Sequence, residues 1–369
     1  MNMKIYIYVF VVLILFCSLY IFRVKQLSSF NNRIAEYTLS DRTNKIFNDS
    51  MQGVSQDPYS DWDFYKNVSR EAILKAFPKK VIDTIMEMNE KDLPQAIILH
   101  NVSIDHIVPA TPRDGLRPTD KGFISESILL GFCSLLDCKP ILSSPNSNIV
   151  SKNPALKNKG SYIHQIIPLD DEESKLTQSS SGSTASFGPH TEAVQYEHPI
   201  KFFLLYCLRG DPKVPTSLIF LDDLLLFIKN NFNLSTCASY KKFLEELKKP
   251  QFIMRDSTDI KTASFETILP ILIEDNGKRI FRFDSNGVKI EGIDEHAQSI
   301  VDYLKRVLND EAFKAKYVKK FYLKKGDLLI FNNLEVLHAR DSFEIDVNNW
   351  RWLQRIYCSQ NLNESYKKF

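Results

Sequence analysis

The sequence lacks the patterns that mark several common classes of protein. Its six cysteines form no CxxC pair, and their spacings match no zinc site. No block of basic residues with interleaved aromatic residues is present, and a formal charge of only +2 argues against a nucleic-acid partner. There is no internal repeat. A doubly wound parallel fold is not expected, because strands and helices do not alternate regularly and no Gly-rich first turn occurs.

The cysteines lie in apolar surroundings. Cys133, Cys207 and Cys358 each fall within an apolar run, and a free cysteine in such a run behaves as a small buried hydrophobic residue. This usage favours a reducing compartment.

The longest apolar run stands at the N-terminus. Residues 5–22, IYIYVFVVLILFCSLYIF, are 18 residues without a charge. At about 1.5 Å per residue, a helix over them would extend about 27 Å, close to the thickness of a bilayer's hydrocarbon core. A cleaved signal peptide would need a shorter apolar core and small residues at the cut. We therefore expect residues 1–22 to be an uncleaved membrane anchor, with its orientation left open because the flanking positive charges nearly balance.

The rest of the chain divides by composition. Residues 23–60 are polar and mixed, and are predicted to form a linker or loosely packed leader, followed by a single domain over 61–369. Apolar residues at helical spacing occur in 69–89, 124–137 and 297–308, whereas 95–102, 200–210, 319–333 and 350–360 have the pattern of strands. The pattern predicts a mainly β fold with flanking helices, in the form of an antiparallel sheet or barrel.

Two possible metal ligands stand two residues apart in SFGPHTEAVQYEHP (186–199). On a strand, residues i and i+2 face the same side, so His190 and Glu192 would present an imidazole and a carboxylate together. Two histidines and one carboxylate are the ligands of non-haem Fe(II) oxygenases. A single HxE is common by chance, so the alternative is a pair of polar residues on a surface strand.

A third ligand is available near the end of the chain. His338 follows the apolar strand in GDLLIFNNLEVLHARDSF, a setting that His164, His198 and His296 do not share. The alternative for His338 is a histidine at a loop end, satisfied by ordinary hydrogen bonds.

The segment RWLQR adds two cations. Arg351 and Arg355 are four residues apart on a strand-like run, and they lie among apolar and aromatic residues, where an unpartnered charge would be costly. The forked guanidinium matches the distal carboxylate that 2-oxoglutarate leaves free when its keto acid binds iron. Thr216, after the central strand, is placed to add a hydroxyl to the same carboxylate. The alternative is a pair of surface arginines.

Taken in order, these segments resemble the clavaminate synthase-like branch of the taurine dioxygenase superfamily, which includes asparagine and arginine hydroxylases. The resemblance rests on HTEAVQYEHPIKFFLLYCLRGDP, KKGDLLIFNNLEVLHARDSF and RWLQRIY, with weaker matches in AIILHNV, LLGFCSLLD and TQSSSGSTAS. It covers about residues 60–358 and leaves the apolar N-terminus outside.

The resemblance implies a double-stranded β-helix (jelly-roll) core and a defined cofactor set. Fe(II) would be bound by His190, Glu192 and His338, with O₂ as the oxidant. The cosubstrate 2-oxoglutarate would be held by Arg351 with help from Thr216.

The same resemblance suggests where a substrate binds. Arg355 would contact either the cosubstrate or the substrate carboxylate, and Ser180 and Asp284 are candidates for further substrate contacts. The loop between His338 and Arg351 is about one residue shorter than in close relatives and lacks their usual glycine, so this edge of the pocket is expected to differ.

We therefore expect an Fe(II)/2-oxoglutarate-dependent dioxygenase that hydroxylates an unactivated C–H of an amino acid, free or carrier-bound, and releases succinate and CO₂. Because Glu192 is a carboxylate, no position on iron is vacated for a halide, which favours hydroxylation over halogenation. Two alternatives stay open, a desaturase or cyclase of the same fold and a membrane-tethered, non-catalytic binding protein. Fe(II) and 2-oxoglutarate are scarce outside the cell, which favours a cytoplasmic catalytic domain.

Overall fold

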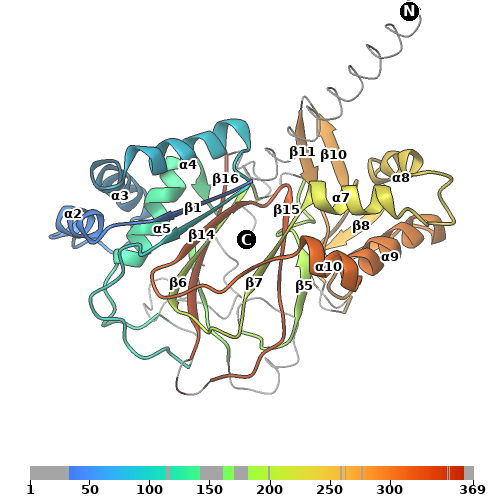
Figure 1. Ribbon diagram of the computed structural model, residues 1–369. Helices are drawn as coiled ribbons and strands as arrows, with labels where there is room; N and C mark the ends of the chain where they lie inside the picture. The colour runs from blue at the N-terminus through green and yellow to red at the C-terminus, as the bar shows by residue number, and fades with distance from the viewer. Residues whose placement is uncertain are drawn as a thin grey trace, which may run out of the picture.

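The computed structural model (Figure 1) describes residues 33–113, 117–141, 161–169, 182–197, 200–257, 260–261, 263–275, 277–346, 348 and 350–360. The predicted anchor over residues 1–22 and the candidate Ser180 lie outside these ranges. Among the helices that are described, none is both long enough and apolar enough to cross a bilayer.

The larger of the two main sheets has seven strands in the described part of the chain. In spatial order they are β1 (Ile34–Thr38), β2 (Ala96–His100), β14 (Leu328–Asn332), β6 (Phe202–Arg209), β16 (Trp352–Ser359) and β3 (Lys139–Pro140), with β4 (Ile163–Ile166) also paired to β16. β1 and β2 are parallel, and the other pairs are antiparallel.

The second main sheet has four antiparallel strands in the order β13 (Lys319–Phe321), β7 (Thr216–Phe220), β15 (Val336–Arg340) and β5 (Phe187–His190). One apolar cluster joins it to the larger sheet. Phe203 and Leu205 on β6 and Phe331 on β14 belong to the same buried cluster as Leu218 and Phe220 on β7. The two sheets therefore pack against each other through alternate residues of their strands.

The outer face of the larger sheet is covered by helices α2 (Asp41–Met51), α3 (Trp62–Ala76), α4 (Lys79–Lys91) and α5 (Ile124–Leu135), which lie together on one side of the molecule (Figure 1). Leu204 and Tyr206 on β6 pack into this helix-facing cluster, while their neighbours Phe203 and Leu205 face the second sheet. Both faces of β6 are thus buried, which explains why its sequence has no polar alternation.

A third cluster lies beyond the second sheet. It contains α7 (Leu221–Asn230), α8 (Tyr240–Leu247), α9 (Glu295–Asn309) and α10 (Glu311–Tyr317), with the small strands β8 (Phe252–Arg255), β9 (Glu266–Leu269), β10 (Leu272–Asp275), β11 (Lys278–Phe281) and β12 (Ile290–Gly292). Figure 1 shows this group opposite α2–α5. The expected combination of strands and flanking helices is therefore present.

Part of the predicted linker is instead built into the fold. β1 pairs along its whole length with β2, and on α2 the side chains of Phe47 and Met51 are buried in the core. The sequence hides this role because β1 is a short edge strand and α2 buries only three of its eleven residues, which leaves the composition polar.

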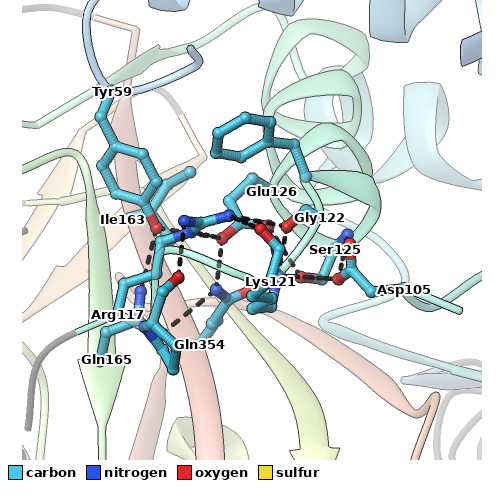
Figure 2. Close-up of polar contacts among 12 residues, drawn as sticks. Tyr59, Asp105, Arg117, Lys121, Gly122, Ser125, Glu126, Ile163, Gln165 and Gln354 are labelled. Atoms are coloured by element: carbon cyan, nitrogen blue, oxygen red, sulfur yellow. Dashed lines mark hydrogen bonds and ion pairs between the residues drawn. The ribbon is translucent and has the colours of Figure 1, made fainter. Parts of the chain in front are cut away.

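A buried polar network joins α5 to β16 (Figure 2). Glu126 on α5 accepts hydrogen bonds from Arg117 Nε at 2.9 Å, from Lys121 Nζ at 2.6 Å and from Gln354 Nε2 at 2.9 Å. Lys121 Nζ is also 2.7 Å from a carboxylate oxygen of Asp105. Because two cations meet two carboxylates with the side chains almost fully buried, the network fastens β16 to the helical layer.

The C-terminal end of β16 carries a second link to the helical layer. Cys358 forms a disulfide with Cys138, which lies in the turn after α5. The expectation that Cys358 is a free buried thiol is therefore wrong, because the sheet brings together two cysteines 220 residues apart. Cys133 and Cys207 are buried free thiols, as their apolar runs predict.

Candidate active site

His190, Glu192 and His338 converge between two neighbouring strands. His190 ends β5 and is the register partner of His338 on β15, while Glu192 stands just past the end of β5. Glu192 Oε2 lies 3.7 Å from His190 Nε2 and 3.9 Å from His338 Nε2. One ligand atom from each residue lies within 4.8 Å of the others, so one cation can contact all three.

Hydrogen bonding orients His190 as a ligand. Its Nδ1 lies 2.9 Å from the carbonyl oxygen of Gly188. A carbonyl only accepts, so Nδ1 carries the proton and Nε2 presents its lone pair on the side of Glu192. The strand backbone therefore selects the tautomer that a metal requires.

The three side chains are arranged to bind a cation and make no hydrogen bonds with one another through the buried atoms named next. Among the described residues, His190 Nε2, Glu192 Oε2 and His338 Nδ1 are buried and have no hydrogen-bond partner. Buried polar atoms without partners are rare, and two of these, His190 Nε2 and Glu192 Oε2, lie only 3.7 Å apart, as two ligands of one ion would. On His338 it is the other ring nitrogen, Nε2, that lies 3.9 Å from Glu192 Oε2. Two imidazoles and one carboxylate make up the ligand set of non-haem Fe(II) sites.

Electrostatics prepare two of the three ligands. Burial disfavours ionisation of Glu192, but His190, Arg355 and His338 outweigh burial and hold the pKa of its carboxyl well below the usual range. Burial and the neighbouring His190 push the pKa of His338 well below its usual value. Glu192 is thus ionised and His338 neutral, which are the protonation states that bind a metal.

A pocket opens beside these ligands and is lined by both main sheets. The lining residues are Ile166, Phe187, His190, Phe203, Leu205, Thr216, His338, Ala339, Arg340, Arg351, Leu353 and Arg355. Of the residues that the sequence singles out, the structure therefore brings His190, Thr216, His338, Arg351 and Arg355 to one pocket.

The two predicted arginines reach the pocket by the alternation of β16. Arg351, Leu353 and Arg355 face it, whereas Trp352 and Ile356 pack into the helix-facing cluster. Arg351 is buried, and burial lowers its pKa to about 10. It is a buried cation in the lining of the pocket, where an anionic ligand would offset the cost of its burial.

Asp284 lies beside the ligands in a turn that supports them. Its backbone forms a bridge with that of His190. Its Oδ1 accepts hydrogen bonds from Asn286 N at 2.9 Å and from Asn286 Nδ2 at 2.7 Å. One carboxylate oxygen of Asp284 is thus occupied by its own turn, and a contact between Asp284 and substrate stays a prediction.

The pocket also contains residues that were not expected from the sequence. Arg340 lines it, donates from Nη2 to the carbonyl oxygen of Ala185 at 2.7 Å, and has its pKa lowered to about 9 by burial and by Arg351. Its spacing of two residues from His338 on the same strand was the available signal. His164 contacts Arg355 through Nδ1, and no local pattern marks that contact because β4 and β16 are far apart in the chain.

Comparison with known proteins supports the interpretation of His190, Glu192 and His338 as the ligands of a non-haem iron site. The family model described as taurine catabolism dioxygenase TauD, TfdA family matches residues 243–357. An L-asparagine oxygenase of Streptomyces coelicolor is 25% identical over 274 residues, which are 73% of this chain and 72% of the relative. Over these segments the chain is similar to TauD-like oxygenases. One solved structure that the chain resembles is the non-haem iron oxygenase OrfP in complex with Fe and alpha-ketoglutaric acid.

Solved structures with the same fold include two amino-acid oxygenases. Asparagine oxygenase in complex with Fe(II), 2S,3S-3-hydroxyasparagine and succinate superposes on this chain with a TM-score of 0.69 at 20% identity, over 88% of this chain and 93% of that one. The non-haem iron oxygenase OrfP in complex with Fe, succinate and (3R,4R)-dihydroxy-L-Arg gives a TM-score of 0.68 at 18% identity, over 90% and 97%.

Proposed function

We propose that this protein hydroxylates an unactivated C–H of an amino acid, or of a compound derived from one, in a reaction that depends on Fe(II) and 2-oxoglutarate. The observation that carries the proposal is the cluster of three buried ligand atoms within 4.8 Å, beside a pocket that holds Arg351 and Arg355. When bound, Fe(II) with 2-oxoglutarate and O₂ supplies the oxidising power for hydroxylation, with release of succinate and CO₂. The facing sheets that carry the ligands also support a double-stranded β-helix core.

Each residue of the pocket has a defined task in this proposal. His190, Glu192 and His338 hold the metal on one side, and leave the pocket side for ligands. Arg351 binds the distal carboxylate of 2-oxoglutarate, with the Thr216 hydroxyl as a second donor, because a fork of two N–H groups matches a carboxylate. The rings of Phe187 and Phe203 lie 4.2 Å from His190 and 4.6 Å from His338, centroid to centroid, and keep water away from the ligands.

The substrate class follows from the polar groups that remain. In the proposal, Arg355 meets the carboxylate of the substrate, and Asp284, with one oxygen outside its turn, meets an ammonium group. Ser180, in the segment before His190, is proposed as a further contact. The relatives named above support an amino acid, since they carry hydroxylated asparagine or arginine. The intact ligand set argues against a non-catalytic binding protein.

Anaerobic titration of the purified protein with Fe(II) and then 2-oxoglutarate tests the proposal. A keto acid that chelates Fe(II) through two oxygens gives a weak visible charge-transfer band. We expect this band in the wild type and in His296→Ala, a matched change on the exposed face of α9, and its loss in His190→Ala and His338→Ala. Absence of the charge-transfer band in folded wild-type protein would contradict the proposal.

Product analysis then separates the possible reactions. L-Asparagine, L-arginine and other free amino acids are screened for succinate release, and the products are weighed by mass spectrometry. Gain of one oxygen atom means hydroxylation, whereas loss of two hydrogen atoms means desaturation or cyclisation.

The apolar segment over residues 5–22 is the basis of a further part of the proposal. We infer that it anchors the protein in a membrane. Fe(II) and 2-oxoglutarate are available on the cytoplasmic side, whereas the Cys138–Cys358 disulfide is typical of an oxidising compartment, so the orientation stays open. Cell fractionation tests this prediction. The full chain is expected in the membrane pellet and to resist extraction by salt and alkali, while a chain that lacks residues 1–22 is expected in the soluble fraction. Equal distribution of the two proteins would contradict an anchor.

A further inference from the structure

The side chain of His164 makes a specific contact with Arg355 from the neighbouring strand. His164 on β4 is the register partner of Arg355 on β16, and both side chains are buried. Arg355 Nη2 lies 3.0 Å from His164 Nδ1. The other ring nitrogen, Nε2, lies 3.2 Å from the carbonyl oxygen of Ser161. Since the carbonyl only accepts, Nε2 carries the proton, and Nδ1 is the acceptor for the guanidinium.

Aromatic rings fix the remaining freedom of the guanidinium. The Arg355 guanidinium carbon lies 4.3 Å from the ring centroid of Tyr357 and 5.7 Å from that of Phe203. The ring of His164 meets Tyr357 edge to face, at 5.2 Å between centroids. His164 therefore contacts both Arg355 and one of the rings that pack against it, so its position determines where Arg355 points.

The acceptor on His164 is neutral, and this has an electrostatic consequence. Burial and the adjacent Arg355 lower the pKa of His164 to about 3, so the imidazole is uncharged at neutral pH. The pair therefore keeps the full positive charge of the guanidinium. A carboxylate at position 164 would hold the arginine equally well, but would cancel the charge that an anionic ligand needs.

We propose that His164 is the positioning residue for Arg355, and that it holds the guanidinium through a neutral acceptor so that the pocket presents a fixed and fully charged cation to a ligand carboxylate. The geometry of the pair stands by itself, whereas the identity of the ligand rests on the proposed function. If His164 merely filled space, the position of Arg355 and the binding of carboxylates would not depend on an acceptor atom or on the charge at position 164.

Three substitutions separate these properties. His164→Asn places an amide oxygen near the position of Nδ1 and keeps a neutral acceptor. His164→Leu fills the site without an acceptor, and His164→Asp supplies an acceptor with a negative charge. His296→Asn, on the exposed part of α9, is the matched control.

The first measurement follows the guanidinium directly in the full-length protein. The arginine Nε–H signals are recorded by nitrogen-15 NMR, and the Arg355 signal is assigned from its loss in Arg355→Lys. We expect its position and its slow exchange with solvent to persist in His164→Asn and His296→Asn, and to change in His164→Leu. An Arg355 signal that is the same in His164→Leu as in the wild type would overturn the positioning role.

The second measurement is binding of 2-oxoglutarate and of L-asparagine and L-arginine to the Fe(II)-loaded protein without O₂, by calorimetry. His164→Asn is expected to bind like the wild type. His164→Asp is expected to bind at least one of these carboxylates about tenfold more weakly or worse, because the aspartate neutralises the charge of Arg355 and so weakens its hydrogen bond to the ligand carboxylate. Unchanged affinities in His164→Asp would overturn the electrostatic part. If His164→Leu does not fold, the role of His164 is tested by comparing His164→Asn with His164→Asp, because both variants supply an acceptor and differ in charge.

The two proposals fail in different ways. If the wild type binds neither Fe(II) nor 2-oxoglutarate while the Arg355 signal still depends on His164, the proposed function fails and the positioning role stands. If the wild type binds both Fe(II) and 2-oxoglutarate, but the Arg355 signal and the ligand affinities are the same in all variants at position 164, only the positioning role fails.

Discussion

Individual residues in this protein are placed by the pairing of strands more than by their immediate neighbours in sequence. His190 and His338 are 148 positions apart by their numbers and yet are register partners on adjacent strands. Glu192 reaches the same point because it lies two residues past the end of β5, where the chain leaves the sheet. Two of the three ligands therefore lie at or just past the end of β5, whereas His338 comes from the middle of β15.

The guanidinium of Arg351 offers a sharp test at this scale. Arg351→Lys keeps the positive charge but loses the planar fork, so we expect the Kd of 2-oxoglutarate to rise about tenfold or more while Fe(II) binding is unchanged. Titration of the charge-transfer band measures both quantities. Arg306→Lys on α9, away from the pocket, is the matched control. An unchanged Kd in Arg351→Lys would mean that another group holds the distal carboxylate.

At the scale of elements, β16 links the catalytic pocket with the helical layer. Arg351 and Arg355 point from one face into the pocket, and Gln354 points from the other face to Glu126 on α5 (Figure 2). The same strand ends in the disulfide at Cys358. The register of β16, and with it the position of both arginines, is therefore set from the side opposite the pocket.

Glu126 is the centre of that arrangement, so its removal should be costly. Glu126→Gln leaves the buried charge of Arg117 without its carboxylate and leaves Lys121 with Asp105 alone, and we expect the free energy of unfolding at pH 7 to fall by about 3 kcal/mol. Urea denaturation measures this change. Glu87→Gln removes half of an exposed pair with Lys91 on α4 and should cost less than about 0.5 kcal/mol.

The same substitution has a predictable pH dependence. Burial disfavours the ionised form of Glu126, but Lys121 and Arg117 outweigh burial and lower its pKa to about 2, from 4.5 as the usual value. A carboxyl whose pKa is lower in the folded state stabilises the fold above the usual pKa, and this contribution is lost as the pH falls towards the folded value. The difference in stability between wild type and Glu126→Gln should therefore shrink between about pH 4.5 and pH 2. A difference that stays constant over this range would contradict the assigned cause.

At the scale of the whole molecule, segments that are distant in sequence close the structure. The edge strand β1, near residue 34, extends the sheet whose opposite edge is tied by the Cys138–Cys358 disulfide. Residues 33–60 and the end of β16 thus belong to one continuous core, although the polar composition of residues 33–60 does not mark them as part of it.

The disulfide predicts a covalent result. Protein denatured with an alkylating agent but without a reductant should yield the peptides of Cys138 and Cys358 as a linked pair, whereas Cys237 should be alkylated. Mass spectrometry of the digest detects both outcomes. Cys358→Ser should lower the free energy of unfolding by about 2 kcal/mol or more, because the cross-link closes a long loop. Complete alkylation of Cys358 without a reductant would show that the bond does not form in the protein.

The sequence by itself determined the residue types that indicate an Fe(II) and 2-oxoglutarate site. The HxE pair, a histidine after a late apolar strand and two arginines four apart are all local patterns. In the fold Glu192 stands past the end of β5, so strand alternation alone does not place it beside His190. The helices α5 and α9 and the strands β2 and β6 followed from periodicity, which is likewise a local pattern.

Only the tertiary structure decided the features that depend on contacts between distant segments. The pairing of β1 with β2, the Cys138–Cys358 bond, the place of Arg340 in the pocket and the contact of His164 with Arg355 all require two stretches of chain to meet. Neither stretch carries a local mark of its partner, since sheet register is set by packing across the core rather than by neighbours along the chain. The positioning of Arg355 is therefore a property of the folded molecule, while its charge is a property of the sequence.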